Sequence, residues 1–61
     1  MKLLKIEEHY YSIVYIDDDG KYEVYKRFNE DKWQKYHNNE WKDISNIGEL
    51  ENIYNDFKNR K

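Results

Sequence analysis

The feature that most constrains this chain is its size: 61 residues without a single cysteine must fold around one small hydrophobic core. A chain of this length buries only about 60% of the surface that it exposes when unfolded. Its core then contributes roughly 3–5 kcal/mol to stability. The missing cysteines exclude disulfide bridges and thiolate metal sites. We therefore expect one domain over residues 1–61 that is held together by apolar packing.

The residues available for that core are unusually aromatic. The chain has seven Tyr, two Trp and two Phe but only one Met. This is more aromatic surface than a core of this size can hide. Tyr and Trp provide large contact areas with few rotatable bonds, and they concentrate in the hot spots of protein interfaces. The excess predicts a protein-binding surface. The alternative is that some tyrosines are half-buried packing residues with their hydroxyl groups in water.

Charge and coding bias limit the classes of partner and compartment. The net charge is −2, so the chain lacks the overall basic field of a typical nucleic-acid-binding protein. Lys, Asn, Ile and Tyr have AT-rich codons, whereas Ala and Pro are absent, which indicates an AT-rich source genome such as a low-GC bacterium or its phage. The longest strictly apolar run, residues 13–16, is too short for a membrane span, and residues 1–8 lack the apolar segment of a signal peptide. We expect a cytoplasmic protein that does not bind membranes.

The first half of the sequence predicts a β-hairpin. Residues 9–16 are rich in strand formers, residues 17–20 (Asp-Asp-Asp-Gly) form a turn signal, and residues 21–28 alternate with period two. The simplest register sets Asp17 opposite Lys21. The predicted core face then holds Tyr10, Ser12, Val14, Ile16, Tyr22, Val24 and Phe28. The opposite face, either half-covered or a contact surface, holds Tyr11, Ile13, Tyr15, Glu23, Tyr25 and Arg27.

The C-terminal segment predicts a helix over residues 47–58. Apolar residues recur there at helical spacing, namely Ile47, Leu50, Ile53, Tyr54 and Phe57. Asn46 is the expected N-cap, with Glu49 three residues later in a capping-box arrangement. We expect this apolar stripe to pack on the sheet.

Residues 29–44 allow two interpretations. In the first, residues 29–31 turn, 32–37 form a strand, Asn38-Asn39 form a tight turn and 40–44 return, so that two aromatic residues of this hairpin face each other. In the second, a short helix begins at residue 29. We prefer the strands, because Asn-Asn flanked by aromatic residues is typical of a type I′ turn. The expected fold is therefore α+β: an antiparallel sheet of three to four strands with one C-terminal helix on one face.

No residue pattern predicts catalysis, a cofactor or a metal site. Ser12 and Ser45 are the only serines, and neither belongs to an arguable triad. His9 and His37 are two isolated histidines without the spacing of a metal site. The Asp-Asp-Asp-Gly run lacks the calcium-loop pattern and is read as a solvated acidic turn. Such a tip could instead dock on a basic patch of a partner or mimic phosphate groups.

The middle of the chain also suggests an alternative ligand. Residues 21–42 contain six Lys or Arg against four Asp or Glu, and aromatic residues are interleaved with them. Stacking rings beside phosphate-binding cations are what a single-strand nucleic-acid binder needs. The basic residues that this alternative requires are Lys26, Arg27, Lys32 and Lys35.

The segment Tyr11–Lys21, with Tyr22 and Tyr25 after it, resembles the first hairpin of small phage-encoded uracil-DNA glycosylase inhibitors. The resemblance implies an acidic, dimeric protein that occupies the DNA-binding site of the enzyme. It also implies a short helix after the hairpin that carries an aromatic residue, an acid and a Tyr toward the enzyme. Residues 30–36 lie in the corresponding place, with Gln34 where the acid is expected. The predicted C-terminal helix departs from that family, whose chain ends in a strand.

Together these patterns predict a non-enzymatic intracellular binding module, encoded by a phage or mobile element, that inhibits or modulates a host protein by covering its surface. Inhibition of uracil-DNA glycosylase and binding of single-stranded nucleic acid are the alternatives. A homodimer is a further prediction, because a second copy enlarges the core of a small chain. The predicted contacts are Tyr11, Tyr15, Tyr25, Trp33, Tyr36 and Trp41, with Asp17, Asp18 and Asp19 as an acidic tip.

Overall fold

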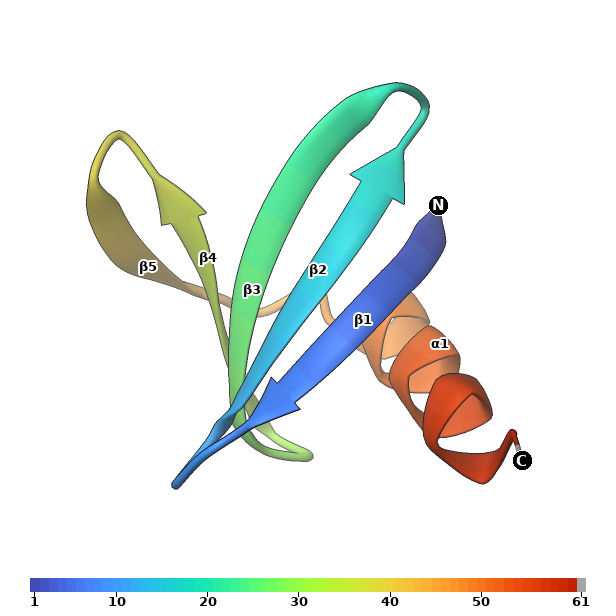
Figure 1. Cartoon of the computed structure of the whole chain (residues 1–61). Helices are drawn as coiled ribbons and strands as arrows, with labels where there is room; N and C mark the ends of the chain where they lie inside the picture. The colour runs from blue at the N-terminus through green and yellow to red at the C-terminus, as the bar shows by residue number, and fades with distance from the viewer. Residues whose placement is uncertain (61) are drawn as a thin grey trace.

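The computed structural model describes residues 1–60 as one antiparallel sheet with a C-terminal helix, which is an α+β fold (Figure 1). The strands lie in the sheet in the same order as in the sequence, so the sheet is a simple meander. The elements are β1 (Lys2–Glu8), β2 (Ser12–Asp18), β3 (Lys21–Asn29), β4 (Lys32–His37), β5 (Glu40–Ile44) and α1 (Gly48–Asn59). The sheet has five strands, one more than the largest number expected.

The additional strand is β1. Its sequence, KLLKIEE, breaks the alternation of apolar and polar residues, because the pairing with β2 shifts between Leu3 and Lys5. A bulge of this kind adds one residue to the strand, so the residues after it fall on the opposite face from the one that strict alternation predicts. The period-two pattern is therefore lost. Strand β2 begins at Ser12 rather than residue 9, because residues 9–11 form the connection from β1.

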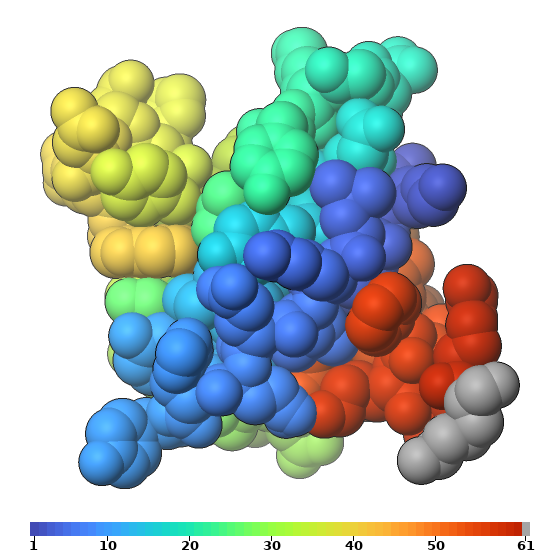
Figure 2. All heavy atoms as spheres, in the orientation of Figure 1, coloured from blue at the N-terminus to red at the C-terminus, as the bar shows by residue number. Residues whose placement is uncertain are grey.

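The β2–β3 and β4–β5 hairpins each have a tight turn with left-handed backbone. Asp19 and Gly20 have φ of 57° and 87° between β2 and β3, and Asn38 and Asn39 have φ of 52° and 64° between β4 and β5. Two successive residues with positive φ form the type I′ turn, whose twist suits a two-residue hairpin loop. The Asn-Asn turn and the two strands around it confirm the first interpretation of residues 29–44. The tips of the two hairpins stand apart as separate lobes (Figures 1 and 2).

The expected register of the first hairpin is wrong by one residue. Asp18, not Asp17, pairs with Lys21, so the loop has two residues instead of three. Because successive side chains point to opposite faces, this shift moves every side chain of β3 to the other face. Tyr25 is therefore buried in the core, whereas Tyr22, Val24 and Phe28, expected in the core, lie on the opposite face. Tyr10, also expected in the core, is fully exposed in the β1–β2 connection.

Helix α1 covers one face of the sheet. It lies beside β1 and away from the tip of the β4–β5 hairpin (Figure 1), while Tyr54 of the helix packs against Trp33 at the start of β4. The helix begins after Ile47, which makes no side-chain cap, so the expected Asn46 cap is not formed. The buried apolar core consists of Val14, Ile16, Tyr25, Trp33, Leu50 and Tyr54. The helix thus packs through the predicted apolar stripe, with Ile47 and Ile53 at the edge of the core.

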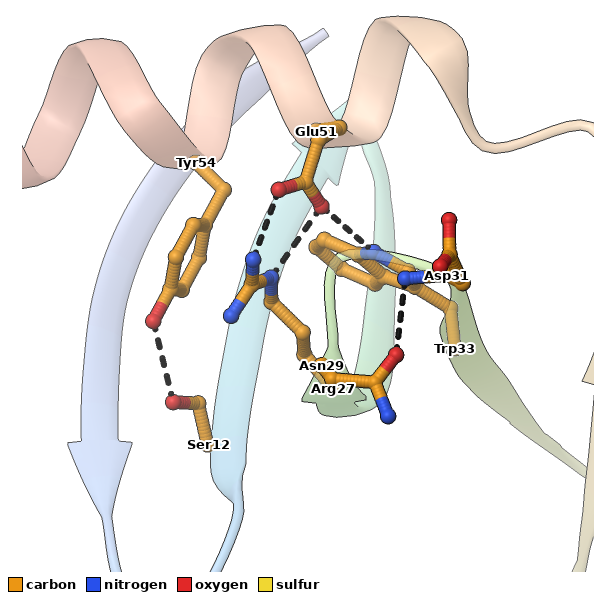
Figure 3. Close-up of polar contacts among 7 residues, drawn as sticks. All are labelled: Ser12, Arg27, Asn29, Asp31, Trp33, Glu51 and Tyr54. Carbon is orange, nitrogen blue, oxygen red and sulfur yellow. Dashed lines mark hydrogen bonds and ion pairs between the residues drawn. The ribbon is translucent and has the colours of Figure 1, made fainter.

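A polar cluster fixes the helix on the sheet (Figure 3). The Glu51 carboxylate accepts hydrogen bonds from Nε and Nη2 of Arg27 at 3.1 and 2.6 Å, and from Nε1 of Trp33 at 2.8 Å. The Arg27 guanidinium also lies 4.2 Å from the centre of the Tyr54 ring. The bonds from Arg27 and Trp33 hold the pKa of Glu51 below its ordinary value, although partial burial opposes that shift. A paired carboxylate therefore links α1 to β3 and β4.

Candidate binding face

The face of the sheet opposite α1, here called the open face, is the candidate binding surface. No helix among residues 1–60 packs against it. The strand register decides which side chains point there. Its aromatic members are Tyr15, Tyr22, Phe28, Tyr36 and Trp41, together with Tyr11 from the β1–β2 connection.

A lysine lies at the centre of the β3–β5 half of the open face. The Nζ atom of Lys26 is 4.6 Å from the ring centre of Tyr11, 4.3 Å from that of Trp41 and 5.8 Å from that of Phe28. A cation this close to ring faces is attracted by their quadrupoles. Tyr36 extends the group, with its ring centre 5.0 Å from that of Trp41. We call these five residues the Lys26 cluster.

The β1–β2 half of the open face is organised differently, because its polar groups satisfy one another. The Tyr15 hydroxyl donates a 2.7 Å hydrogen bond to Glu7, and Lys5 Nζ lies 3.3 Å from the same carboxylate. The bond raises the pKa of Tyr15 and, with the help of Lys5, lowers the pKa of Glu7. The Tyr22 ring lies 6.1 Å from that of Tyr15. This half presents tyrosine rings with little free charge.

The acids of the open face bond to other groups and not to Lys26 or Lys32. Asp17 accepts a hydrogen bond from the backbone of Gly20 at 3.1 Å, and Asp43 accepts one from Gln34 at 2.8 Å. By contrast, no carboxylate of residues 1–60 lies within 4.0 Å of Lys26 or Lys32. The Lys32 ammonium instead lies 5.7 Å from the centre of the Phe28 ring. The Lys26 cluster and Lys32 thus combine rings with unpaired cations.

Four of the six aromatic residues predicted as contacts are on the open face: Tyr11, Tyr15, Tyr36 and Trp41. The other two are core residues, since Tyr25 is 5% and Trp33 1% exposed. The prediction is wrong for Tyr25 because the register differs by one residue, and for Trp33 because the pattern of residues 29–44 does not determine its face. Burial, together with the hydrogen bond that its hydroxyl donates to Glu23, raises the pKa of Tyr25 to about 12.

The acidic tip lies at the end of the β2–β3 hairpin, next to the β1–β2 half of the open face. Asp19 is exposed there, and Asp18 lies 4.0 Å from the N-terminal ammonium group of Met1. Asp17 is committed to the turn through its bond to Gly20. Asp17 and Asp18 are therefore each engaged within the chain, and Asp19 is the most exposed acid of the tip.

The basic residues proposed for nucleic acid are divided between the two faces. Lys26 and Lys32 are on the open face. Arg27 is bound to Glu51 under the helix, and Lys35 lies 2.9 Å from Glu23 on the same side. Only the first two are therefore free to meet a ligand on the aromatic surface.

Sequence reasoning missed two residues of the open face, Tyr22 and Phe28, which are 64% and 40% exposed. It assigned both to the core. The signal that could have found them is Asp19-Gly20, which favours a two-residue type I′ loop over a three-residue loop. A two-residue loop at Asp19-Gly20 is enough to place the side chains of β3 on the faces that the structure shows.

The open face has the chemistry of a binding surface. It offers ring faces, apolar edges and ammonium groups. Among residues 1–60, no three His, Asp or Glu side chains come together as metal ligands. The resemblance to glycosylase inhibitors implies a short helix over residues 30–36, but residues 32–37 form strand β4, and Trp33 points into the core.

Within residues 1–60, no helix has the length and apolar character needed to cross a membrane. Comparison with known proteins finds no protein-family model, curated protein or solved structure that matches this chain.

Proposed function

We propose that this protein is a non-enzymatic intracellular binding module that covers part of the surface of a partner protein with its open face. The observation that supports this proposal is the division of the aromatic residues by the helix. Six aromatic side chains lie on the face that no element of residues 1–60 covers. Exposed aromatic clusters of this kind mark interaction sites on small domains.

The acidic tip extends the proposed contact surface. Asp18 and Asp19 lie beyond Tyr15 and Tyr22 at the end of the same hairpin. Such a surface suits a partner that presents an apolar patch beside a basic one, because the rings supply contact area and the acids supply orientation. The bias toward amino acids with AT-rich codons fits a phage or mobile element, for which a host protein is a natural target.

The test is an affinity pull-down from lysate of the cognate host, followed by mass spectrometry. We expect the native chain to capture a protein that a Tyr22→Ser/Tyr36→Ser variant does not. The matched control is Asn52→Ala, which changes an exposed position of α1 on the opposite side of the molecule. Equal capture by all three chains would contradict the proposal. Recovery of nothing except a second copy of this chain would also contradict it and would indicate self-association.

Inhibition of uracil-DNA glycosylase is one specific form of this proposal, and the acidic tip between tyrosine-bearing strands is the feature that favours it. A uracil-excision assay at a stoichiometric ratio of protein to enzyme tests it directly. Loss of excision by the native chain, restored by an Asp18→Asn/Asp19→Asn variant, is the expected result. Unchanged excision would limit the proposal to other partners.

A further inference from the structure

We infer that the Lys26 cluster binds single-stranded nucleic acid, with bases stacked on its rings and phosphates at Lys26 and Lys32. This inference goes beyond the proposed function, because it assigns a second class of ligand to one half of the open face. It depends on the local arrangement of rings and cations and not on capture of a protein partner.

The first argument is the order of groups across the cluster. Two ring pairs, Tyr11–Phe28 at 5.7 Å and Tyr36–Trp41 at 5.0 Å, lie on either side of the Lys26 ammonium. A single strand of nucleic acid presents bases on both sides of each phosphate. A phosphate at Lys26 would therefore place neighbouring bases near rings on each side, which is the combination that single-strand binders use.

The second argument is that these groups remain available. Phe28 and Tyr36 are 40% and 43% exposed, so part of each ring faces water. Neither Lys26 nor Lys32 has a carboxylate partner within residues 1–60, whereas Lys5 and Lys35 are both paired. A phosphate approaching this half of the face would not have to displace an existing ion pair.

The net charge of −2 does not oppose this inference, because no carboxylate of residues 1–60 forms an ion pair with Lys26 or Lys32. Three of the thirteen acids form the tip of the β2–β3 hairpin, at the far end of β3 from Phe28. Glu7 and Asp43, which share the open face, accept hydrogen bonds from Tyr15 and Gln34. Both carboxylates keep their charge in these bonds, so the inference depends on direct contact between phosphates and the two lysine ammonium groups and not on a net positive field.

An acidic protein segment could meet the same lysines, but it would leave the rings without a planar partner. The exposed ring faces favour bases, whose π surfaces stack without regard to sequence. Duplex nucleic acid is disfavoured for the same reason, because its bases are already stacked and paired. These two ligands are therefore the informative comparisons in a binding experiment.

The experiment uses the purified full chain and fluorescein-labelled oligo(dT) and oligo(rU) of about 12 nucleotides, within the range of known single-strand sites. Anisotropy measures affinity, and tryptophan fluorescence measures stacking. Trp33 is buried and Trp41 is on the open face, so quenching reports Trp41. With two lysine–phosphate contacts, affinity should fall about sevenfold between 50 and 200 mM salt. Comparison of the two oligonucleotides distinguishes DNA from RNA as the source of the strand.

The variants separate phosphate contact from stacking. Lys26→Gln/Lys32→Gln should weaken binding severalfold and remove most of the salt dependence. Trp41→Leu should weaken binding about tenfold and abolish the quenching. Lys42→Gln is the control: it removes one positive charge, as each lysine substitution does, from the residue after Trp41 on the other face of β5, and should leave affinity unchanged. Circular dichroism checks that each variant is folded, and the lysine variants keep the test valid if Trp41→Leu unfolds.

Four results would overturn the inference: no binding at the lower salt, equal weakening by Lys42→Gln, equal affinity for a duplex, or equal affinity and quenching with poly-glutamate. The last would assign the lysines to an acidic protein segment instead. A pull-down from nuclease-treated lysate keeps this test separate from that of the proposed function. Protein capture without oligonucleotide binding contradicts only this inference, and oligonucleotide binding without protein capture contradicts only the proposed function.

Discussion

At the scale of single residues, the attachment of the helix depends most on Glu51. Its carboxylate is the shared acceptor for Arg27 on β3 and Trp33 on β4, so one side chain of α1 holds two strands. Removing a partner from a half-buried ion pair leaves the other charge without compensation. Sequence reasoning did not identify this role, because Glu51 lies in the first turn of the helix, where an acid already has a sufficient reason to occur.

Glu51→Ala should therefore destabilise the fold by about 1–3 kcal/mol, because it leaves the Arg27 guanidinium and the Trp33 N–H without their acceptor. That is a large share of the stability available to a domain of this size. Urea unfolding monitored by tryptophan fluorescence measures the change. Asn52→Ala, at an exposed position of the same helix, is the control. Equal unfolding midpoints for both variants would show that the cluster does not stabilise the fold.

The same carboxylate makes stability depend on pH in the acid range. The pKa of Glu51 is lower in the folded protein than its ordinary value of 4.5. Its contribution is therefore complete above pH 4.5 and is lost as the pH falls through the folded-state pKa. Glu7 and Glu23 are shifted in the same direction. We expect urea midpoints of the native chain to fall on acidification, and those of Glu51→Gln to fall less. Parallel curves for the two proteins would contradict this assignment.

At the scale of elements, the type I′ turns set the register of the hairpins and thereby decide which face each side chain occupies. The β4–β5 turn can be tested without touching the core. Asn39 has φ of 64°, which Gly adopts freely and a β-branched residue adopts only with strain. Asn39→Gly should leave stability unchanged or slightly raised, whereas Asn39→Val should lower it by about 1–3 kcal/mol. Thermal unfolding by circular dichroism measures both, and similar losses for the two would argue against a turn-controlled register.

The elements also show how far the sequence could predict the fold. The helix, the β4–β5 hairpin and the pairing of Tyr36 with Trp41 follow from local patterns and are confirmed. The faces of β3 are not predictable from period two alone, because a loop of two or three residues fits residues 17–20 almost equally well. Only the preference of Asp-Gly for the shorter loop separates these registers. The register error also affects the predicted binding residues. Tyr25, predicted as a contact, is in the core, and Phe28, predicted in the core, is on the open face.

At the scale of the whole molecule, the helix divides the aromatic residues into two populations. Tyr25, Trp33 and Tyr54 form one edge-to-face series, with ring centres 6.2 and 5.9 Å apart, between the sheet and α1. The rings of the open face pair with one another and with lysines instead. The first population stabilises the fold by burial, and the second is available for ligands. The large aromatic content is therefore divided between the core and the open face.

This division predicts opposite outcomes for substitutions on the two faces. Trp33→Ala should cost about 3–5 kcal/mol, because it empties a fully buried site, and that loss equals the whole stability expected of such a core. A Tyr22→Thr/Tyr36→Thr/Trp41→Thr variant should lose only about 1–2 kcal/mol, because Thr keeps the strand propensity and the main losses are cross-strand ring contacts and the contact of Lys26 with Trp41. Far-ultraviolet circular dichroism and urea unfolding distinguish a folded chain from an unfolded one. If the triple variant unfolded like Trp33→Ala, the open-face rings would be packing residues. If it stayed folded, it would provide the binding-deficient chain against which each proposed ligand can be measured.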